Sequence, residues 1–302
     1  MAIVHEGPAA SGVEAAAWHP TYDFLMCSLR ERPTGPRDSR RAFLLAAGAA
    51  LAAPALAQVE VGKPSMARNL VPAESLERAG AQQYGDLLRQ AQAKGALGGE
   101  SNPQVQRLRA IAARIIPFVA KWNERAAKWK WEVNLIGSKQ INAFCMPGGK
   151  IAFFSGILDQ LKLTDDEVAM VMGHEVAHAL REHARARLAK TAGTGAALQL
   201  GAQILGWGQL GDLGARATTQ LISLKFSRND ETEADLVGLE LAARAGYDPQ
   251  AAVTLWKKMA AVSKREGGIG FLSTHPSSPE RIKVLEANVA KVEGLYRAAK
   301  RG

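Results

Sequence analysis

Residues 164–181 decide the fold of this chain, and they read Thr-Asp-Asp-Glu-Val-Ala-Met-Val-Met-Gly-His-Glu-Val-Ala-His-Ala-Leu-Arg. Thr164 is a natural N-cap, and Glu167 three residues later completes a capping box, so a helix should begin here. Apolar residues recur through the stretch that follows. We therefore expect the helix to continue to about Lys190.

Two histidines on this helix are candidate metal ligands. His174 and His178 stand four residues apart, about 40° from each other around the helix and one turn along it, so both imidazoles can reach one ion. Glu175 projects beside the same ion without binding it, where it could take a proton from a metal-bound water. A plain amphipathic helix is the alternative, but a buried histidine pair without a metal would leave polar groups unsatisfied.

A third ligand is expected on a second helix, predicted over about residues 217–245. Glu231 and Asp235 lie one turn apart on one face of it, so Glu231 can bind the ion while Asp235 accepts a hydrogen bond from a ligand imidazole. Glu233 should point away into solvent. Two surface carboxylates near Arg228 are the alternative interpretation.

The number of ligands indicates the kind of metal site. Three protein ligands and one water form the open arrangement of catalytic zinc, whereas a structural zinc site is closed by four ligands, usually including cysteine. We therefore expect one Zn²⁺ per chain.

The rest of the chain predicts an α+β fold that is mostly helical, with a small antiparallel sheet beside the active-site helix. A helix kinked at Pro117 should start at Pro103, and short β-rich runs follow at 131–135, 141–146 and 150–155. Two further helices should open at Pro249 and Pro279. The Gly-rich segment 192–214 is expected to be mobile or interfacial, and one hypothesis makes it a lid over the cleft.

The N-terminal part has the pattern of an export signal. Ser39-Arg40-Arg41 precedes an apolar run that ends in Ala55-Leu56-Ala57, and this resembles a twin-arginine signal peptide. The run is shorter than the roughly 20 residues of a membrane span, although an uncleaved anchor is the alternative. We expect an exported, periplasmic protein with residues 1–57 as extension and signal, 58–102 as a partly helical leader, and 103–302 as the metal-binding domain.

Cysteine content and charge exclude some classes of protein. Cleavage after Ala57 would leave Cys145 as the one cysteine, so a disulfide framework is excluded. The formal charge of +9 is not concentrated in a block, which favours a solvated basic surface, with peripheral membrane contact possible. In Lys128-Trp129-Lys130-Trp131 the alternation fits a half-buried strand better than a platform for nucleic acid. No nucleic-acid partner is therefore expected.

Five ordered motifs between about residues 100 and 290 resemble peptidase family M48, the Ste- and HtpX-like zinc metallopeptidases, and within it the exported BepA-like and mitochondrial Oma-like branch. The motifs are Asn142-Ala143-Phe144 with Pro147-Gly148-Gly149, Gly156-Ile157-Leu158, His174 to His178, Ser227-Arg228 with Glu231 to Asp235, and Thr274-His275-Pro276-Ser277.

This resemblance implies a zincin-like zinc metallopeptidase and assigns the third ligand to Glu231 rather than Glu233. It also implies that His275 lies over the metal, where it steadies an oxyanion or fills the open coordination position at rest. Arg281 is similar to an arginine that supports the site, whereas His183 matches no motif and is expected to be solvated.

The resemblance further implies that Asn142, Ala143 and Phe144 form an edge strand that receives an extended substrate by strand addition. The predicted function is a zinc-dependent endopeptidase that hydrolyses envelope proteins, periplasmic or at the membrane surface, in protein quality control. The alternative is a chaperone-like module that binds unfolded envelope proteins and has low or latent proteolytic activity. Substrate identity and oligomeric state are not predicted.

Overall fold

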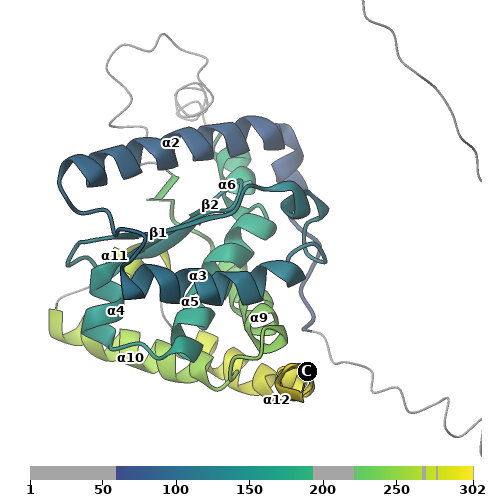
Figure 1. Ribbon diagram of the computed structural model, residues 1–302. Helices are drawn as coiled ribbons and strands as arrows, with labels where there is room; N and C mark the ends of the chain where they lie inside the picture. Colours follow the sequence, from purple (N-terminus) through teal and green to yellow (C-terminus); the bar gives the residue numbers. More distant parts are fainter. Residues whose placement is uncertain (1–58, 193–220, 223, 267–269, 277, 302) are drawn as a thin grey trace, which may run out of the picture. The chain divides into compact units, whose positions relative to one another are not determined.

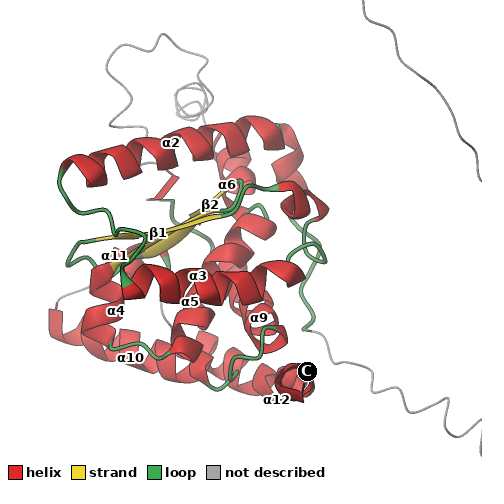
Figure 2. Ribbon diagram, in the orientation of Figure 1, coloured by secondary structure: helices red, strands yellow, loops and turns green. Residues whose placement is uncertain are grey.

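Helices make up most of the structure, with one small sheet among them (Figure 2). The computed structural model describes residues 59–192, 221–222, 224–266, 270–276 and 278–301. The predicted signal and nearly all of the Gly-rich segment lie outside these residues. The α+β class is confirmed, while the boundary predicted at residue 102 stays a prediction.

The first described elements are helical. They are the 3₁₀ helix η1 (Met66–Leu70), α2 (Ala73–Ala93) and α3 (Pro103–Ile115), followed by the 3₁₀ turns η2 (Ile116–Phe118) and η3 (Glu124–Lys128). Proline in the first turn of η2 ends α3, because its ring cannot continue the helical hydrogen bonds.

The sheet contains three strands, β1 (Glu132–Ile136), β2 (Ala143–Met146) and β3 (Lys150–Phe154), in the order β1-β3-β2. β2 and β3 form the expected antiparallel hairpin through Gly148 and Gly149, whose φ angles of 88° and 79° suit glycine. β1 pairs with β3 in parallel, so the prediction of a wholly antiparallel sheet is wrong. β3 lies between β1 and β2 in the sheet. Because β2 runs opposite to β1, and β3 in turn runs opposite to β2, β3 has the same direction as β1.

Both faces of the sheet are buried, and alternate residues of β3 enter different cores. Ile151 and Phe153 belong to the main core, which α3 and the helix α5 (Asp165–Leu180) cover. Ala152 and Phe154 instead pack with Tyr84 and other residues of α2. Figure 1 shows α2 on one side of the strands and α3 with α5 on the other. Because β2 ends the strand order, one of its edges has no strand partner among the described residues.

The predicted capping box starts α5. The Thr164 side chain accepts from the Glu167 backbone N–H, and the Glu167 carboxylate accepts from the Thr164 N–H at 2.9 Å. The expected continuation to about Lys190 is wrong, because α5 ends at Leu180 and α6 (His183–Ala192) begins in a new direction. Glu182 between them has a left-handed φ of 57°, which breaks the helix.

The second helix of the predicted site begins later than expected. α9 runs over Arg228–Arg244, because Ser227 and Asp230 form a capping box at its start. The other helices within the described ranges are α4 (Ser155–Leu161), α10 (Ala251–Glu266), α11 (Gly270–Thr274) and α12 (Pro279–Arg301), and the last one opens at the predicted proline. None of the helices in the described ranges is long and apolar enough to cross a membrane.

α5 and α9 cross with their backbones in contact. A Cβ atom on Gly238 would lie 2.6 Å from the backbone nitrogen of His174, and one on Gly173 would lie 2.7 Å from the carbonyl oxygen of Gly238. Both distances are shorter than real carbon contacts permit, so only glycine fits at either position. This crossing places His174 on α5 opposite the carboxylates of α9.

We predict that Gly238→Ala destabilises the protein by about 1–3 kcal/mol, because the added methyl group forces two packed backbones apart. Gly294→Ala is the matched control, since a Cβ atom there meets nothing within 4 Å on an exposed turn of α12. The control should be neutral or stabilising. Chemical unfolding of both variants checks this, and equal stabilities would contradict the account of the crossing.

Candidate metal centre

α5 presents two imidazole rings to one point. His174 and His178 are each 4% exposed, and their Nε2 atoms lie 3.1 Å apart. Residues of α5 around them, such as Val171 and Met172, are fully packed and fix the helix in place. Two unprotonated ring nitrogens this close repel each other unless a proton or a cation lies between them.

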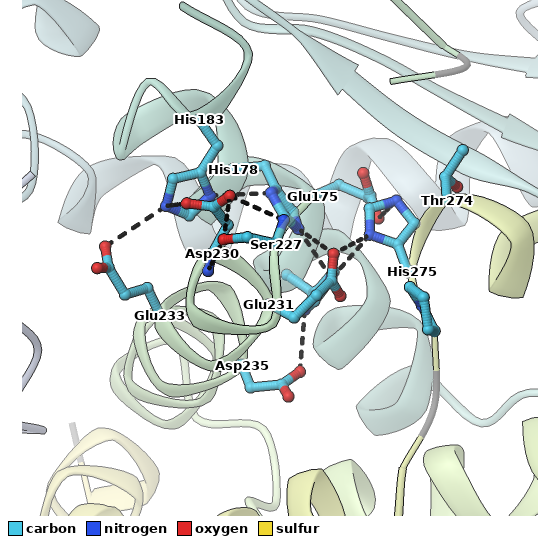
Figure 3. Close-up of polar contacts among 12 residues, drawn as sticks. Glu175, His178, His183, Ser227, Asp230, Glu231, Glu233, Asp235, Thr274 and His275 are labelled. Atoms are coloured by element: carbon cyan, nitrogen blue, oxygen red, sulfur yellow. Dashed lines mark hydrogen bonds and ion pairs between the residues drawn. The ribbon is translucent and has the colours of Figure 1, made fainter. Parts of the chain in front are cut away.

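α9 and the residue after α11 supply two more donors. The carboxylate oxygens of Glu231 lie 3.5 Å from Nε2 of His174 and 3.5 Å from Nε2 of His178. His275 Nδ1 lies 3.1 Å from Glu231 Oε1 and 3.3 Å from His174 Nε2. One ligand atom from each of these four residues falls within 4.8 Å of all the others, and Figure 3 shows the Glu231 carboxylate facing His275.

The donor set fits zinc. Nitrogen and oxygen ligands at 2.0–2.2 Å around a tetrahedral ion lie roughly 3.3–3.6 Å from one another. The neighbouring separations here are 3.1 to 3.5 Å. Glu231 Oε2 is buried and accepts no hydrogen bond of acceptable geometry from the described residues, although Arg281 Nη1 is 2.8 Å away. A lone pair that remains available at this point suits a metal ligand.

Asp235 and Arg281 hold His174 and Glu231 in place. Asp235 Oδ1 lies 3.0 Å from Nδ1 of His174, so that the Nε2 atom is left facing the cluster. Arg281 donates to both oxygens of Asp235 at 2.7 Å, and its guanidinium lies 3.8 Å from the centre of the Trp256 ring. Burial alone would raise the pKa of the Asp235 carboxyl, but Arg281 and His174 hold it below its usual range.

Three of the clustered groups, His174, His178 and Glu231, have shifted pKa values. Burial alone would lower the pKa of His174, but hydrogen bonds to Asp235 and Glu231 raise it to about 9. Burial, together with the neighbouring rings, lowers the pKa of His178 well below its ordinary value. Burial would raise the pKa of Glu231, yet hydrogen bonds with His174 and His275 outweigh it and hold that pKa far below its usual range.

Glu175 lies beside the cluster. It is 3% exposed, and its Oε1 atom accepts no hydrogen bond from any described residue, while His275 Nε2 lies 3.5 Å away. Burial raises the pKa of Glu175, although His275 and His174 oppose the shift. A carboxylate with a raised pKa and a vacant lone pair is suited to accept a proton.

Two expectations about neighbouring side chains are wrong. His183 is not solvated, since it is 4% exposed and its Nδ1 atom lies 2.9 Å from Nδ1 of His178. Glu233 does not point into open solvent, because Arg181 Nε donates to it at 2.8 Å and His183 Nε2 lies 3.4 Å away. The error about His183 follows from the helix break at Glu182, which the sequence pattern did not indicate.

A cleft leads to the cluster along β2. Its volume is about 690 Å³ when the open solvent at its mouth is included, and it reaches from Glu175, His178 and His275 to the N-terminal end of α2. Its walls are largely apolar and include Leu76, Phe144, Met146, Leu221, Ile222 and Phe226. The strand predicted to receive substrate therefore lines the same cleft as the candidate ligands.

Comparison with known proteins gives a family. Residues 103–289 match the family model described as Peptidase family M48. These residues contain β2, α5 and α9, and with them the four clustered side chains, Glu175, Asp235 and Arg281.

Individual relatives match over about half of this chain. Mitochondrial metalloendopeptidase OMA1 of Schizosaccharomyces pombe is 40% identical over 162 residues, which are 52% of this chain and 46% of the relative. Metalloprotease LoiP of Escherichia coli is 33% identical over 150 residues, covering 48% and 57%. The beta-barrel assembly-enhancing protease of Yersinia pestis is 31% identical over 174 residues, covering 53% and 35%. The chain thus spans about half the length of these relatives.

The pKa values predict that zinc binding releases a proton. With a pKa of about 9, the His174 ring carries a second proton, and thus a positive charge, at pH 7 in the metal-free protein. A metal ion must displace this second proton. His178 has no second proton to release, because its pKa lies well below the ordinary value. Apparent affinity should therefore fall as the pH drops below 9, by up to about tenfold per pH unit. Calorimetry in buffers of different ionisation enthalpy measures this. An affinity that stays flat between pH 6.5 and 8.5 would rule the assignment out.

Proposed function

Because the chain belongs to peptidase family M48, we propose that it is a zinc-dependent endopeptidase, with His174, His178 and Glu231 as the ligands. The observation that carries the proposal is that these three side chains converge from two helices while the buried Glu175 carboxylate beside them has an oxygen without a hydrogen-bond donor. Four mutually facing donors without an ion would be a costly arrangement in a protein interior.

The proposed chemistry divides between the ion and the chain. Zinc bound to this donor set would make water acidic near neutral pH and would polarise a substrate carbonyl. Glu175 takes a proton from the attacking water and returns it to the leaving amine, a role for which its raised pKa is suited. Asp235 and Arg281 keep the ligands oriented throughout, because they bond to His174 and to each other.

His275 has two proposed roles at one position. Its Nδ1 atom lies among the other donors, as a fourth ligand at rest would, and its Nε2 atom faces Glu175. With substrate bound, the ring would donate to the developing oxyanion, a contact that contributes about 3 kcal/mol in other acyl-transfer enzymes. His275→Ala should then lower kcat by roughly 10²-fold or more, and an unchanged kcat would remove the oxyanion role.

We propose that substrate adds to β2 as a further strand. Phe154 N–H donates to the Asn142 carbonyl, so residues 142, 144 and 146 pair with β3, and the backbone groups of Ala143 and Cys145 face the free edge. The Asn142 side chain already accepts from Ala143 N–H, which leaves the Cys145 N–H and the two carbonyls for a peptide. The apolar cleft walls favour large apolar side chains in that peptide, as in unfolded proteins.

The proposed location is the periplasm. Support comes from the Arg40-Arg41 pair and the small residues before Gln58. Among the relatives, one is named for β-barrel assembly and another for the mitochondrion. Quality control of envelope proteins is the corresponding physiological role.

The main test is Glu175→Gln. The variant should bind zinc as the wild type does but lose casein cleavage by about 10²–10⁴-fold, because the neutral amide cannot accept the proton. A chelator should abolish wild-type cleavage. Near-normal proteolysis in the variant would reject Glu175 as the base, and zinc-loaded wild type that binds casein without cutting it would favour the chaperone-like alternative.

The same inactive variant tests strand addition. A structure of it with a peptide rich in large apolar residues should show the peptide antiparallel or parallel to β2, with a hydrogen bond to the backbone of Cys145. A peptide bound in the cleft without backbone contacts to β2 would contradict this part of the proposal.

Export is tested by replacing both arginines, Arg40→Lys and Arg41→Lys. Because twin-arginine transport requires both arginines, the double variant should accumulate uncleaved in the cytoplasm of a bacterial host. Cell fractionation should place the wild type in the periplasm. Equal periplasmic amounts of both proteins would argue against this route.

A further inference from the structure

His183 makes a contact that the proposed mechanism does not use. It is the first residue of α6, it is buried, and its Nδ1 atom lies 2.9 Å from Nδ1 of the proposed ligand His178. Its other nitrogen, Nε2, lies 3.4 Å from Oε2 of Glu233 on α9. Figure 3 shows His183 between the two, with the dashed line from its ring to Glu233.

The helix break at Glu182 brings this contact about. On one continuous helix, residue 183 would stand about 140° around the axis from residue 178, and the two rings could not meet. The left-handed turn at Glu182, with φ of 57°, redirects the chain so that His183 lies against His178. Arg68 at 3.0 Å and Arg185 at 2.7 Å hold the Glu182 carboxylate, so this unusual backbone conformation is supported from both sides.

Hydrogen-bond chemistry fixes the direction of every bond in this chain of residues. His178 directs Nε2 at the other donors, so as a neutral ligand it carries its hydrogen on Nδ1 and must donate it to His183. Nδ1 of His183 is then the acceptor, which leaves the hydrogen of that neutral ring on Nε2. That hydrogen points to Glu233, a carboxylate that only accepts.

Arg181 completes the chain at the far end. Its guanidinium lies 2.7 and 2.8 Å from Glu233 Oε2 and also donates to the carbonyl of Gly62. The hydrogen-bonded residues therefore follow in the order His178, His183, Glu233 and Arg181, from the proposed ligand to the arginine. His174 has a shorter version of the same arrangement, in which Asp235 accepts from the ring and Arg281 holds Asp235.

We propose that His183 is a positioning residue that fixes the tautomer and the ring orientation of His178, in the way that Asp235 does for His174. The inference rests on the proposed function, since it takes His178 to be a zinc ligand. An acceptor at Nδ1 prevents the hydrogen from moving to Nε2, where it would block the ion. Loss of such a partner typically weakens metal binding by about 10–100-fold.

The test compares two substitutions at one position in the full chain. His183→Leu removes the acceptor, and zinc affinity measured by competition with a chromophoric chelator should fall by about 10–100-fold. His183→Asn keeps an oxygen near the place of Nδ1, so its affinity should stay within about threefold of the wild type. Thermal unfolding of the metal-free proteins is measured in parallel, because a merely structural residue would move the unfolding midpoint without this split.

The matched control is a substitution at Glu233, the carboxylate on the other side of the His183 ring. Glu233→Gln still offers an acceptor oxygen to His183, so its zinc affinity should stay close to that of the wild type. It also reports on any effect of disturbing Arg181 while the His183 ring, which accepts from His178, stays in place.

The outcomes separate this inference from the proposed function. Zinc binding by wild type, weak binding by His183→Leu and recovery in His183→Asn support it. If the wild type binds zinc and His183→Leu binds equally tightly, the inference fails while the proposed function stands. Equal losses in both variants with equally lowered unfolding midpoints mean a structural role and also overturn it. A wild type that binds no zinc rejects the proposed function and the inference together.

Discussion

The structure depends on a contact between two backbones. α5 and α9 meet at Gly173 and Gly238, where a single methyl group on either glycine would lie within 2.7 Å of the other helix. Because the helices approach this closely, short side chains suffice to bridge them, and His174 and His178 reach Glu231 and Asp235 from the opposite helix. The capping boxes at Thr164 and Ser227 then fix where each helix starts, and so which residues face the crossing.

The charges buried around this crossing favour a divalent cation at the proposed site. Glu175, Glu231 and Asp235 are each at most 5% exposed, and Arg281 is the cation buried among them at 6%. Once an ion has displaced the His174 proton, the ionised Glu231 and Asp235 carboxylates outnumber the Arg281 guanidinium by one charge, and Glu175 adds a further negative charge whenever it is ionised. Isolated buried charges are strongly unfavourable, so an ion of charge +2 would relieve what Arg281 leaves uncompensated. Burial raises the pKa of Glu175 in these surroundings, which suits its proposed role as a base.

The sequence predicted those features that depend on local spacing. Helical geometry alone predicts the capping box, the one-turn separation of His174 and His178, and the shared face of Glu231 and Asp235. The structure confirms the capping box and brings the four side chains together. His275 and Arg281 were predicted from motif resemblance, since no local pattern links them to their partners Glu231 and Asp235, which lie 44 and 46 residues away in the sequence. The parallel pairing of β1 was missed because strand order is set by tertiary packing. His183 was missed because a left-handed residue at a helix end is usually glycine, and here it is Glu182.

The most direct test of the central claim is a crystal structure of the zinc-loaded full chain, with anomalous data collected on both sides of the zinc edge. The account predicts one strong anomalous peak per chain, about 2.0–2.2 Å from Nε2 of His174, Nε2 of His178 and a carboxylate oxygen of Glu231. A peak at a different place, or one at this site with Glu231 turned away from the ion, would contradict it.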